Sequence, residues 1–273
     1  MSRILVRGNR YEVRTGGRGT AVLLVHGFTG RGADWSAFLP ALRRSHTTVV
    51  VDLLGHGRSD APRDPACHAI ERQAADLAEV LRRLGTAPAV AVGYSMGARI
   101  VLRLAMDAPG VVSGLILESP SAGIADRDER QARRAADDAQ ADRIEGEGIE
   151  AFVASWEASP LFAAERRLPA AVRDDIRATR LRNRSDGLAA SLRGAGQGAM
   201  EPLHDRLASI ACPALVVAGD LDPVGVRRAR DVAGRIPSAG LVVLPKTGHA
   251  PHREDPARFR HLLIDQLTAW STA

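Results

Sequence analysis

The sequence predicts an α/β protein with a mostly parallel, doubly wound sheet and an inserted helical cap. Strand-length apolar runs alternate with helix-length amphipathic segments, which is typical of βαβ units. Several runs, such as Ala21–Val25, are apolar throughout, as expected for strands buried on both faces. From about residue 120 to 203 these runs disappear, and Ala, Arg, Asp and Glu dominate at helical spacing. We therefore expect a core made of residues 1–120 and 204–273 and a cap made of residues 121–203.

The first 120 residues are expected to alternate strands and helices. Residues 3–13 alternate apolar and polar side chains, like a half-exposed strand or hairpin. Residues 66–84 have the pattern of a long amphipathic helix that ends at Gly85. The predicted strands are 3–13, 21–25, 47–53, 89–92 and 114–118, and the predicted helices are 33–42, 66–84 and 100–106.

The second half begins with the cap and then returns to the alternating pattern. Joints between the cap helices are expected at Pro160, Pro169, Gly187 and the glycine run at residues 194–198. In the last helix, Asp255 is the expected N-cap, because Pro256 suits the first helical position. The remaining predicted strands are 214–218 and 240–244, and the remaining predicted helices are 224–234 and 255–270.

Composition argues against several classes of partner. Of 273 residues, 45% are hydrophobic and 25% charged, as in an ordinary globular protein. The net charge of +5 comes from basic residues that are scattered and interleaved with acidic ones, so we expect no nucleic-acid partner. No apolar run has membrane-spanning length and the N-terminus lacks a secretory pattern, so we expect a cytoplasmic enzyme, a monomer or weak homo-oligomer, that does not bind membranes. Cys67 and Cys212 lie far apart outside any metal motif, so we expect no disulfide, metal or cofactor.

Residues 93–97 read Gly-Tyr-Ser-Met-Gly and lie between a predicted strand and a predicted helix. In that context the pattern is typical of a nucleophile elbow, in which a sharp turn projects the hydroxyl of Ser95 out of the chain. The flanking glycines remove side chains that would clash in so tight a turn. Alone, the pattern is equally compatible with a glycine-rich turn that carries an idle serine.

A serine hydroxyl needs an imidazole to take its proton and a carboxylate to orient that imidazole. Ser95, Asp222 and His249 occur in the order expected for this fold, and each follows an apolar strand. Asp220 is a second candidate for the acid. The competing histidines are His26 and His56, which we interpret as structural, and His252, which faces either the pocket or the surface.

An oxyanion hole requires backbone N–H groups that point to the developing negative charge. One usually belongs to the residue after the nucleophile, and the other to a loop early in the chain. The sequence therefore predicts the N–H groups of Met96 and Phe28 for this role.

Four motifs together resemble the α/β-hydrolase superfamily over nearly the whole chain: His-Gly-Phe at 26–28, residues 52–59, the elbow at 93–97, and Gly-His at 248–249. Further segments, among them Gly-Tyr-Ser-x-Gly-x-Arg and the run from His249 to Pro256, resemble the 2-succinyl-6-hydroxy-2,4-cyclohexadiene-1-carboxylate synthase family of menaquinone biosynthesis. The resemblance favours Asp222 over Asp220 as the acid. It implies a carbon–oxygen lyase that eliminates pyruvate, with Ser95 acting as a base.

The same resemblance implies a substrate with several carboxylates and a set of residues that bind it. Arginine suits such a substrate because its planar guanidinium binds carboxylates bidentately. The implied substrate-binding residues are Tyr94, Arg99, Arg133, Trp156 and Arg182, and Arg134, Arg180 and Arg184 take the places of the cap arginines if the register of the cap differs.

One segment departs from the family, and it leaves other activities open. Pro-Val-Gly follows Asp222, where the family often has a Ser-Lys-Phe type sequence, which puts the pyruvate side of the pocket in doubt. The second possible function is a serine hydrolase of esters, lactones or carbon–carbon bonds. A non-enzymatic binding protein on the same scaffold is disfavoured by the intact Ser, Asp and His.

Overall fold

The computed structural model describes residues 2–271, which form an eight-stranded, mostly parallel sheet in the order β1-β2-β4-β3-β5-β6-β7-β8. β1 pairs with β2, and β2 with β4, in antiparallel fashion, and all other neighbours are parallel. The predicted fold class is therefore confirmed. The strands are β1 (Ser2–Val6), β2 (Asn9–Gly17), β3 (Ala21–Val25), β4 (Thr47–Val51), β5 (Ala89–Tyr94), β6 (Val112–Glu118), β7 (Ala214–Gly219) and β8 (Ala239–Leu244).

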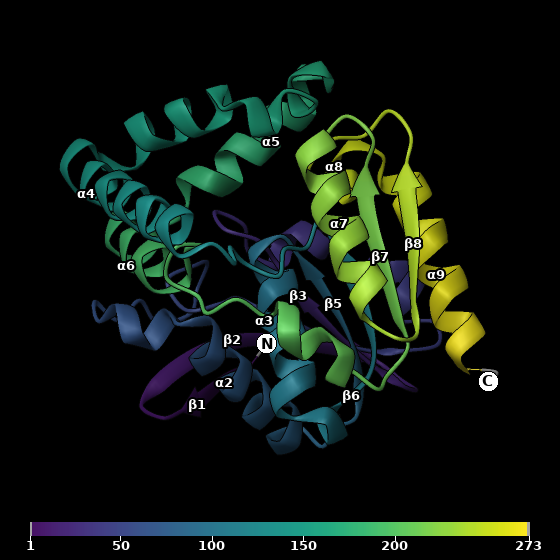
Figure 1. Cartoon of the computed structure of the whole chain (residues 1–273). Helices are drawn as coiled ribbons and strands as arrows, with labels where there is room; N and C mark the ends of the chain where they lie inside the picture. The colour runs from purple at the N-terminus through teal and green to yellow at the C-terminus, as the bar shows by residue number, and fades with distance from the viewer. Residues whose placement is uncertain (1, 272–273) are drawn as a thin grey trace.

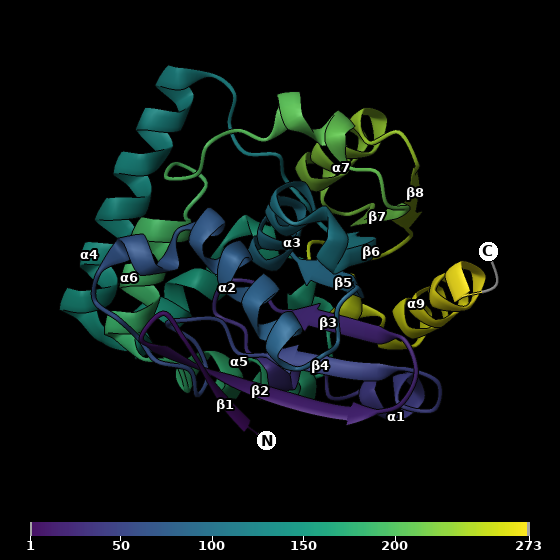
Figure 2. The same cartoon turned by 90° about the horizontal axis from the view of Figure 1, so that it is seen from below.

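Helices cover both faces of the sheet (Figure 2). Because successive side chains of a strand point to opposite faces, Leu23 of β3 packs in the cluster that includes α2 and α3, whereas Leu24 packs in the cluster that includes α1 and α9. Full burial of one such leucine contributes about 1.5–3 kcal/mol to folding. The helices of the two layers are α2 (Ile70–Arg83), α3 (Met96–Asp107) and α7 (Pro223–Arg235) on one face, and α1 (Leu39–Leu42) and α9 (Pro256–Ser271) on the other.

A long helical region is inserted between β6 and β7. It lies beyond the end of the sheet toward which the arrows of β7 and β8 point (Figure 1). Its three long helices are α4 (Arg127–Ala158), α5 (Ala170–Leu181) and α6 (Ser185–Ala195), and Ile144, Phe152 and Leu188 belong to an apolar cluster of this region. Where the region joins the core, the N–H of Leu203 donates to the carbonyl oxygen of Ala122 at 2.7 Å. The segment that enters the region and the segment that leaves it are therefore hydrogen-bonded to each other.

Short elements complete the chain. α8 (Pro251–Glu254), which the sequence pattern does not predict, follows β8, and Asp255 then begins α9 as expected, since its carboxylate accepts the N–H of Arg258. No helix in residues 2–271 combines the length and the apolar character needed to cross a membrane. The 3-10 helices are Gly32–Trp35, Pro65–His68, Pro109–Val111, Pro160–Phe162, Glu165–Arg167 and His204–Ser209.

Two local expectations were wrong, and one break in a helix was not expected. The helix expected at 33–42 is reduced to a 3-10 turn and the four-residue α1, because Pro40 has no N–H to donate to Ser36 in a continuous helix. Gly187 is not a joint but lies inside α6, where a β-carbon would approach the carbonyl oxygen of Gly55 to 2.6 Å. Conversely, Gly148 interrupts α4 with a left-handed φ of 85°, a break that the sequence pattern does not predict.

Candidate active site

Ser95 occupies the turn between β5 and α3. Its φ of 51° and ψ of −105° are unusual for a residue with a side chain, as expected for the strained position of a nucleophile elbow. β-Carbons at Gly93 and Gly97 would lie 2.5 Å from the Gly97 and Val25 carbonyl oxygens, respectively. Glycine at both positions therefore lets β5, α3 and β3 approach closely enough to form the turn.

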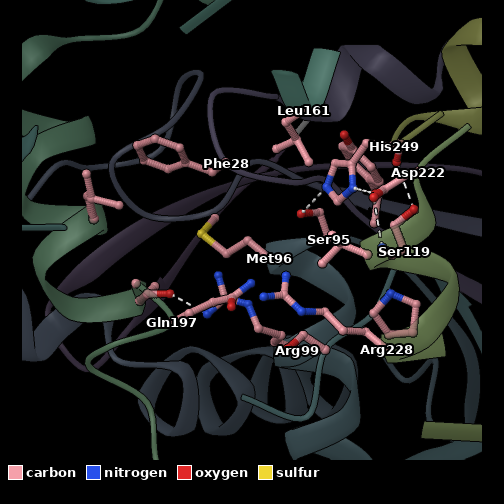
Figure 3. A pocket seen from close by; sticks show the side chains of 18 of the residues that line it. Phe28, Ser95, Met96, Arg99, Ser119, Leu161, Gln197, Asp222, Arg228 and His249 are labelled. Carbon is pink, nitrogen blue, oxygen red and sulfur yellow. Dashed lines mark hydrogen bonds and ion pairs between the residues drawn. The ribbon is translucent and has the colours of Figure 1, made fainter. Parts of the chain in front are cut away.

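The structure brings together the three residues that the sequence predicts as a triad. Nε2 of His249 lies 3.0 Å from Oγ of Ser95, and Nδ1 of the same ring lies 2.9 Å from Oδ2 of Asp222 (Figure 3). Each residue follows a parallel strand at its carboxyl end, so the topology of the sheet places them at one edge. The geometry suits proton transfer from the hydroxyl to the imidazole while the carboxylate fixes the tautomer.

Asp222 is both the N-cap of α7 and the partner of His249. Its second oxygen, Oδ1, accepts the N–H of Gly225 at 2.8 Å. Burial alone would raise the pKa of Asp222, but the hydrogen bonds from His249 and Gly225 outweigh it and hold the pKa below its ordinary value. Asp220 is exposed, and within the described chain the carboxylate on His249 is that of Asp222.

The loop that carries His249 is held in place on both sides. The carboxylate of Glu254 accepts the N–H groups of Gly248 and Ala250, the second at 3.0 Å. Oγ of Ser119 donates to the carbonyl oxygen of His249 at 2.8 Å. The imidazole is therefore positioned by backbone contacts that leave both ring nitrogens free for Ser95 and Asp222.

The other predicted histidines are structural. His26 donates to the carbonyl of Gly27 and accepts the N–H of Leu53, and burial lowers its pKa. His56 bonds the carbonyl of Leu54 at 3.0 Å, and burial lowers its pKa strongly. His252 faces neither the pocket nor the surface: it is buried against Trp35 and bonds the carboxylate of Glu118 at 2.9 Å.

Ser95 lines a cavity that has an aromatic wall and a basic end (Figure 3). Trp156 lies in the wall, with its ring centroid 5.6 Å from that of Phe28 and 5.5 Å from that of Phe162. Tyr94 also lines the cavity, and its ring lies 5.6 Å from the ring of His249. Met96 and Phe28, the predicted oxyanion-hole residues, both reach this space, and Met96 is the first residue of α3, where N–H groups have no acceptor inside the helix.

Arg99 lies one turn after Ser95 on α3 and faces the cavity as predicted. It is only 7% exposed, and one guanidinium nitrogen donates to the carbonyl oxygen of Ala195 at 2.7 Å. Burial, together with the charge of Arg133, lowers the pKa of Arg99 to about 10. Arg133 also lines the cavity and is paired with Asp137 at 2.8 Å.

The structure does not bring Arg182 to the cavity. Arg182 ends α5 and is exposed, whereas Arg180, two residues earlier, is buried. Arg180 pairs with Glu165 at 2.7 Å and its guanidinium lies 4.6 Å from the centroid of the Phe162 ring, so it supports the aromatic wall from behind. Arg134 and Arg184, which a shifted cap register would have brought to the cavity, are exposed.

Arg228 lines the cavity, and reasoning from the sequence missed it. α7 begins directly after Asp222, so residues 224 and 228, four apart on one helical face, both turn toward the space beside the triad. The spacing of residues 224 and 228 after Asp222 is the feature of the sequence from which Arg228 could have been predicted. In the described part of the chain, no three His, Cys, Asp or Glu side chains are grouped so that they would hold a metal ion.

Comparisons with known proteins agree with this architecture. Residues 20–256 match a family model described as the alpha/beta hydrolase fold. A putative 2-succinyl-6-hydroxy-2,4-cyclohexadiene-1-carboxylate synthase of Bacillus subtilis is 38% identical over 264 residues, which cover 96% of each chain. Among solved structures, MenH from S. aureus is 30% identical with a TM-score of 0.91, covering 96% of this chain and 98% of that one. A thermophilic esterase from Thermogutta terrifontis, solved with malate bound, is 27% identical with a TM-score of 0.87 and 99% coverage of both chains.

Proposed function

Because the chain belongs to the α/β-hydrolase superfamily, we propose that it is a carbon–oxygen lyase within it. The proposed reaction eliminates pyruvate from 2-succinyl-5-enolpyruvyl-6-hydroxy-3-cyclohexene-1-carboxylate. Its other product is 2-succinyl-6-hydroxy-2,4-cyclohexadiene-1-carboxylate, the compound named in the B. subtilis relative.

One observation carries the proposal: a cluster of guanidinium groups lies in the cavity of the serine. Arg99, Arg133 and Arg228 all line the space that Ser95 faces. The proposed substrate bears three carboxylates, and arginine is the side chain best suited to bind them. An esterase for small neutral substrates gains nothing from such a cluster, because holding several partly buried cations close together is costly.

In the proposed mechanism Ser95 acts as a base. His249 takes the proton of the hydroxyl, and the resulting alkoxide removes a proton from the ring carbon beside the succinyl carbonyl. The electron pair of that C–H bond forms the C2=C3 double bond, and the existing C3=C4 pair shifts to C4=C5. The bond between ring carbon C5 and the enolpyruvyl oxygen breaks in the same elimination. The departing enolate takes up a proton to give pyruvate. The N–H groups of Met96 and Phe28 stabilise the negative charge that develops on the succinyl carbonyl oxygen.

The second candidate is a serine hydrolase that forms an acyl-enzyme. The likeness to the T. terrifontis esterase favours it, and the same Ser95, His249 and Asp222 would serve. In that case Ser95 attacks a carbonyl carbon instead of removing a proton.

The decisive assay compares pyruvate release from the proposed substrate with hydrolysis of p-nitrophenyl acetate. We expect the enzyme to release pyruvate well above the spontaneous rate, and Ser95→Ala to return it to that rate. Pyruvate release no faster than the spontaneous reaction, with rapid ester turnover, would instead establish the hydrolase.

A further inference from the structure

Arg228 lies on a different helix and on a different side of the cavity from Arg99 and Arg133. Arg99 belongs to α3 and Arg133 to the inserted helical region, whereas Arg228 reaches the cavity from α7, on the side of Asp222. Figure 3 shows its guanidinium next to that of Arg99 and below Ser95. The arginines thus approach from three independent elements.

Arg228 is also the arginine without a partner. Arg99 donates to the carbonyl oxygen of Ala195, and Arg133 pairs with Asp137. Within residues 2–271, no atom forms a hydrogen bond or ion pair with the guanidinium of Arg228. Asp222 is the nearest candidate by position, but Oδ2 bonds His249 and Oδ1 bonds the N–H of Gly225.

The charges around Arg228 are unbalanced. Its side chain is half-buried, and burial together with the charge of Arg133 lowers its pKa, although the nearby charges of Asp222 and Glu129 oppose this shift. The charge of Arg228 in turn contributes to the lowered pKa of Arg99. A partly buried cation that repels its neighbours is costly unless an anion joins it. A purely structural role would require a protein partner, and none is present among the described residues.

We propose that Arg228 binds the third carboxylate of the substrate, on the α7 side of the cavity, and that it selects tricarboxylates over dicarboxylates. This inference rests on the proposed function. Arg99 binds one carboxylate beside α3, Arg133 binds a second from the inserted helical region, and Arg228 binds the third beside the loop that carries Asp222. A ligand with two carboxylates leaves one of these three cations without an anion.

The test uses the full-length enzyme and three variants: Arg228→Ala, Arg228→Lys and the control Arg227→Ala. Arg227 is the adjacent residue on α7, is exposed and does not line the cavity. Binding of tricarballylate and glutarate is measured by isothermal titration calorimetry, and KM and kcat by pyruvate release. Because the binding assay needs no turnover, it separates a failure of this inference from a failure of the proposed lyase activity.

We expect Arg228→Ala to raise KM and to weaken tricarballylate binding by about 10- to 100-fold, the loss of one hydrogen-bonded charge. Glutarate binding should change less than about threefold, so the preference for the tricarboxylate disappears. Arg228→Lys should lie between the wild type and Arg228→Ala, and Arg227→Ala should match the wild type. Because Arg228 has no hydrogen-bonded protein partner in the described chain, its removal should not lower the thermal midpoint.

Three results would overturn the proposal. The first is an unchanged KM together with unchanged tricarballylate affinity in Arg228→Ala. The second is a wild-type enzyme that does not bind tricarballylate. The third is an equal loss for tricarballylate and glutarate with a lowered thermal midpoint, which would make Arg228 a structural residue.

Discussion

Arg253 of α8 and Glu165 of the inserted helical region form a buried ion pair, with Nη1 and Oε1 3.6 Å apart. Arg253 also bonds Asp34 at 2.6 Å, and Glu165 also bonds Arg180 at 2.7 Å. Although burial alone would lower it, Asp34 and the other negative neighbours raise the pKa of Arg253. A row of alternating charges therefore runs from the core to the inserted region that carries the aromatic wall. Its members are Asp34, Arg253, Glu165 and Arg180.

The first prediction concerns this connection. Glu165→Gln removes one anion from between two buried cations, and breaking a buried pair in this way typically costs about 3–5 kcal/mol. We expect the free energy of unfolding in urea to fall by an amount in that range. The control is Glu147→Gln, because Glu147 pairs with Arg143 on the same inserted region but both side chains are about half exposed. It should change stability by less than about 0.5 kcal/mol. Equal losses of unfolding free energy in the two variants would show that the buried charges stabilise the protein no more than the exposed pair does.

The second prediction concerns Arg99. Arg99→Ala should lower kcat/KM for pyruvate release by at least about 10-fold, because a charge-assisted contact with the substrate is lost. Hydrolysis of the uncharged p-nitrophenyl acetate should change less than about threefold. The control is Arg103→Ala, one turn later on α3, where the arginine pairs with Asp107 instead of facing the cavity. A loss of the same size on both substrates would assign Arg99 a structural role.

The third prediction concerns His56 and acid stability. Because burial depresses the pKa of His56 in the folded protein, the unfolded chain takes up a proton first on acidification. Stability is therefore full above the unfolded pKa of about 6.5 and falls as the pH drops below it. His56→Asn removes this titration and keeps an N–H donor.

Urea denaturation at pH 7.0 and 5.5 measures this effect. The loss of unfolding free energy between the two pH values should be about 1 kcal/mol smaller in His56→Asn than in the wild type. His26 keeps its own depressed pKa, so some pH dependence remains. His261→Asn, at an exposed position of α9, controls for the substitution itself. An identical pH dependence in His56→Asn and the wild type would contradict the prediction.

The sequence predicted the sheet and the close approach of Ser95, Asp222 and His249, and for physical reasons. A continuously apolar run such as Ala21–Val25 has one stable place in an α/β protein, between two layers of helices. The order of Ser95, Asp222 and His249, each just beyond such a run, then determined that they would meet at one edge. Neither inference required knowledge of long-range packing.

The orientation of the arginines in the inserted region could not be predicted from the sequence in the same way. Residues 180 and 182 differ by about 200° around a helix axis, so a small error in the helical phase exchanges a buried side chain for an exposed one. The phase of α5 depends on the acids that pair with Arg180, which come from segments distant in the sequence. The break at Gly148 likewise resets the phase of α4. Arg228 was not predicted, although its spacing of four from residue 224 places both on the face of α7 that turns toward the cavity.

The hydrogen bond between Leu203 and Ala122 has an evolutionary consequence. It joins the two ends of the inserted region. Residues can therefore be added or removed between these ends at little entropic cost, without moving the strands that position Ser95, Asp222 and His249. The length of the inserted region can therefore change in evolution while the edge of the sheet where these three residues meet stays as it is.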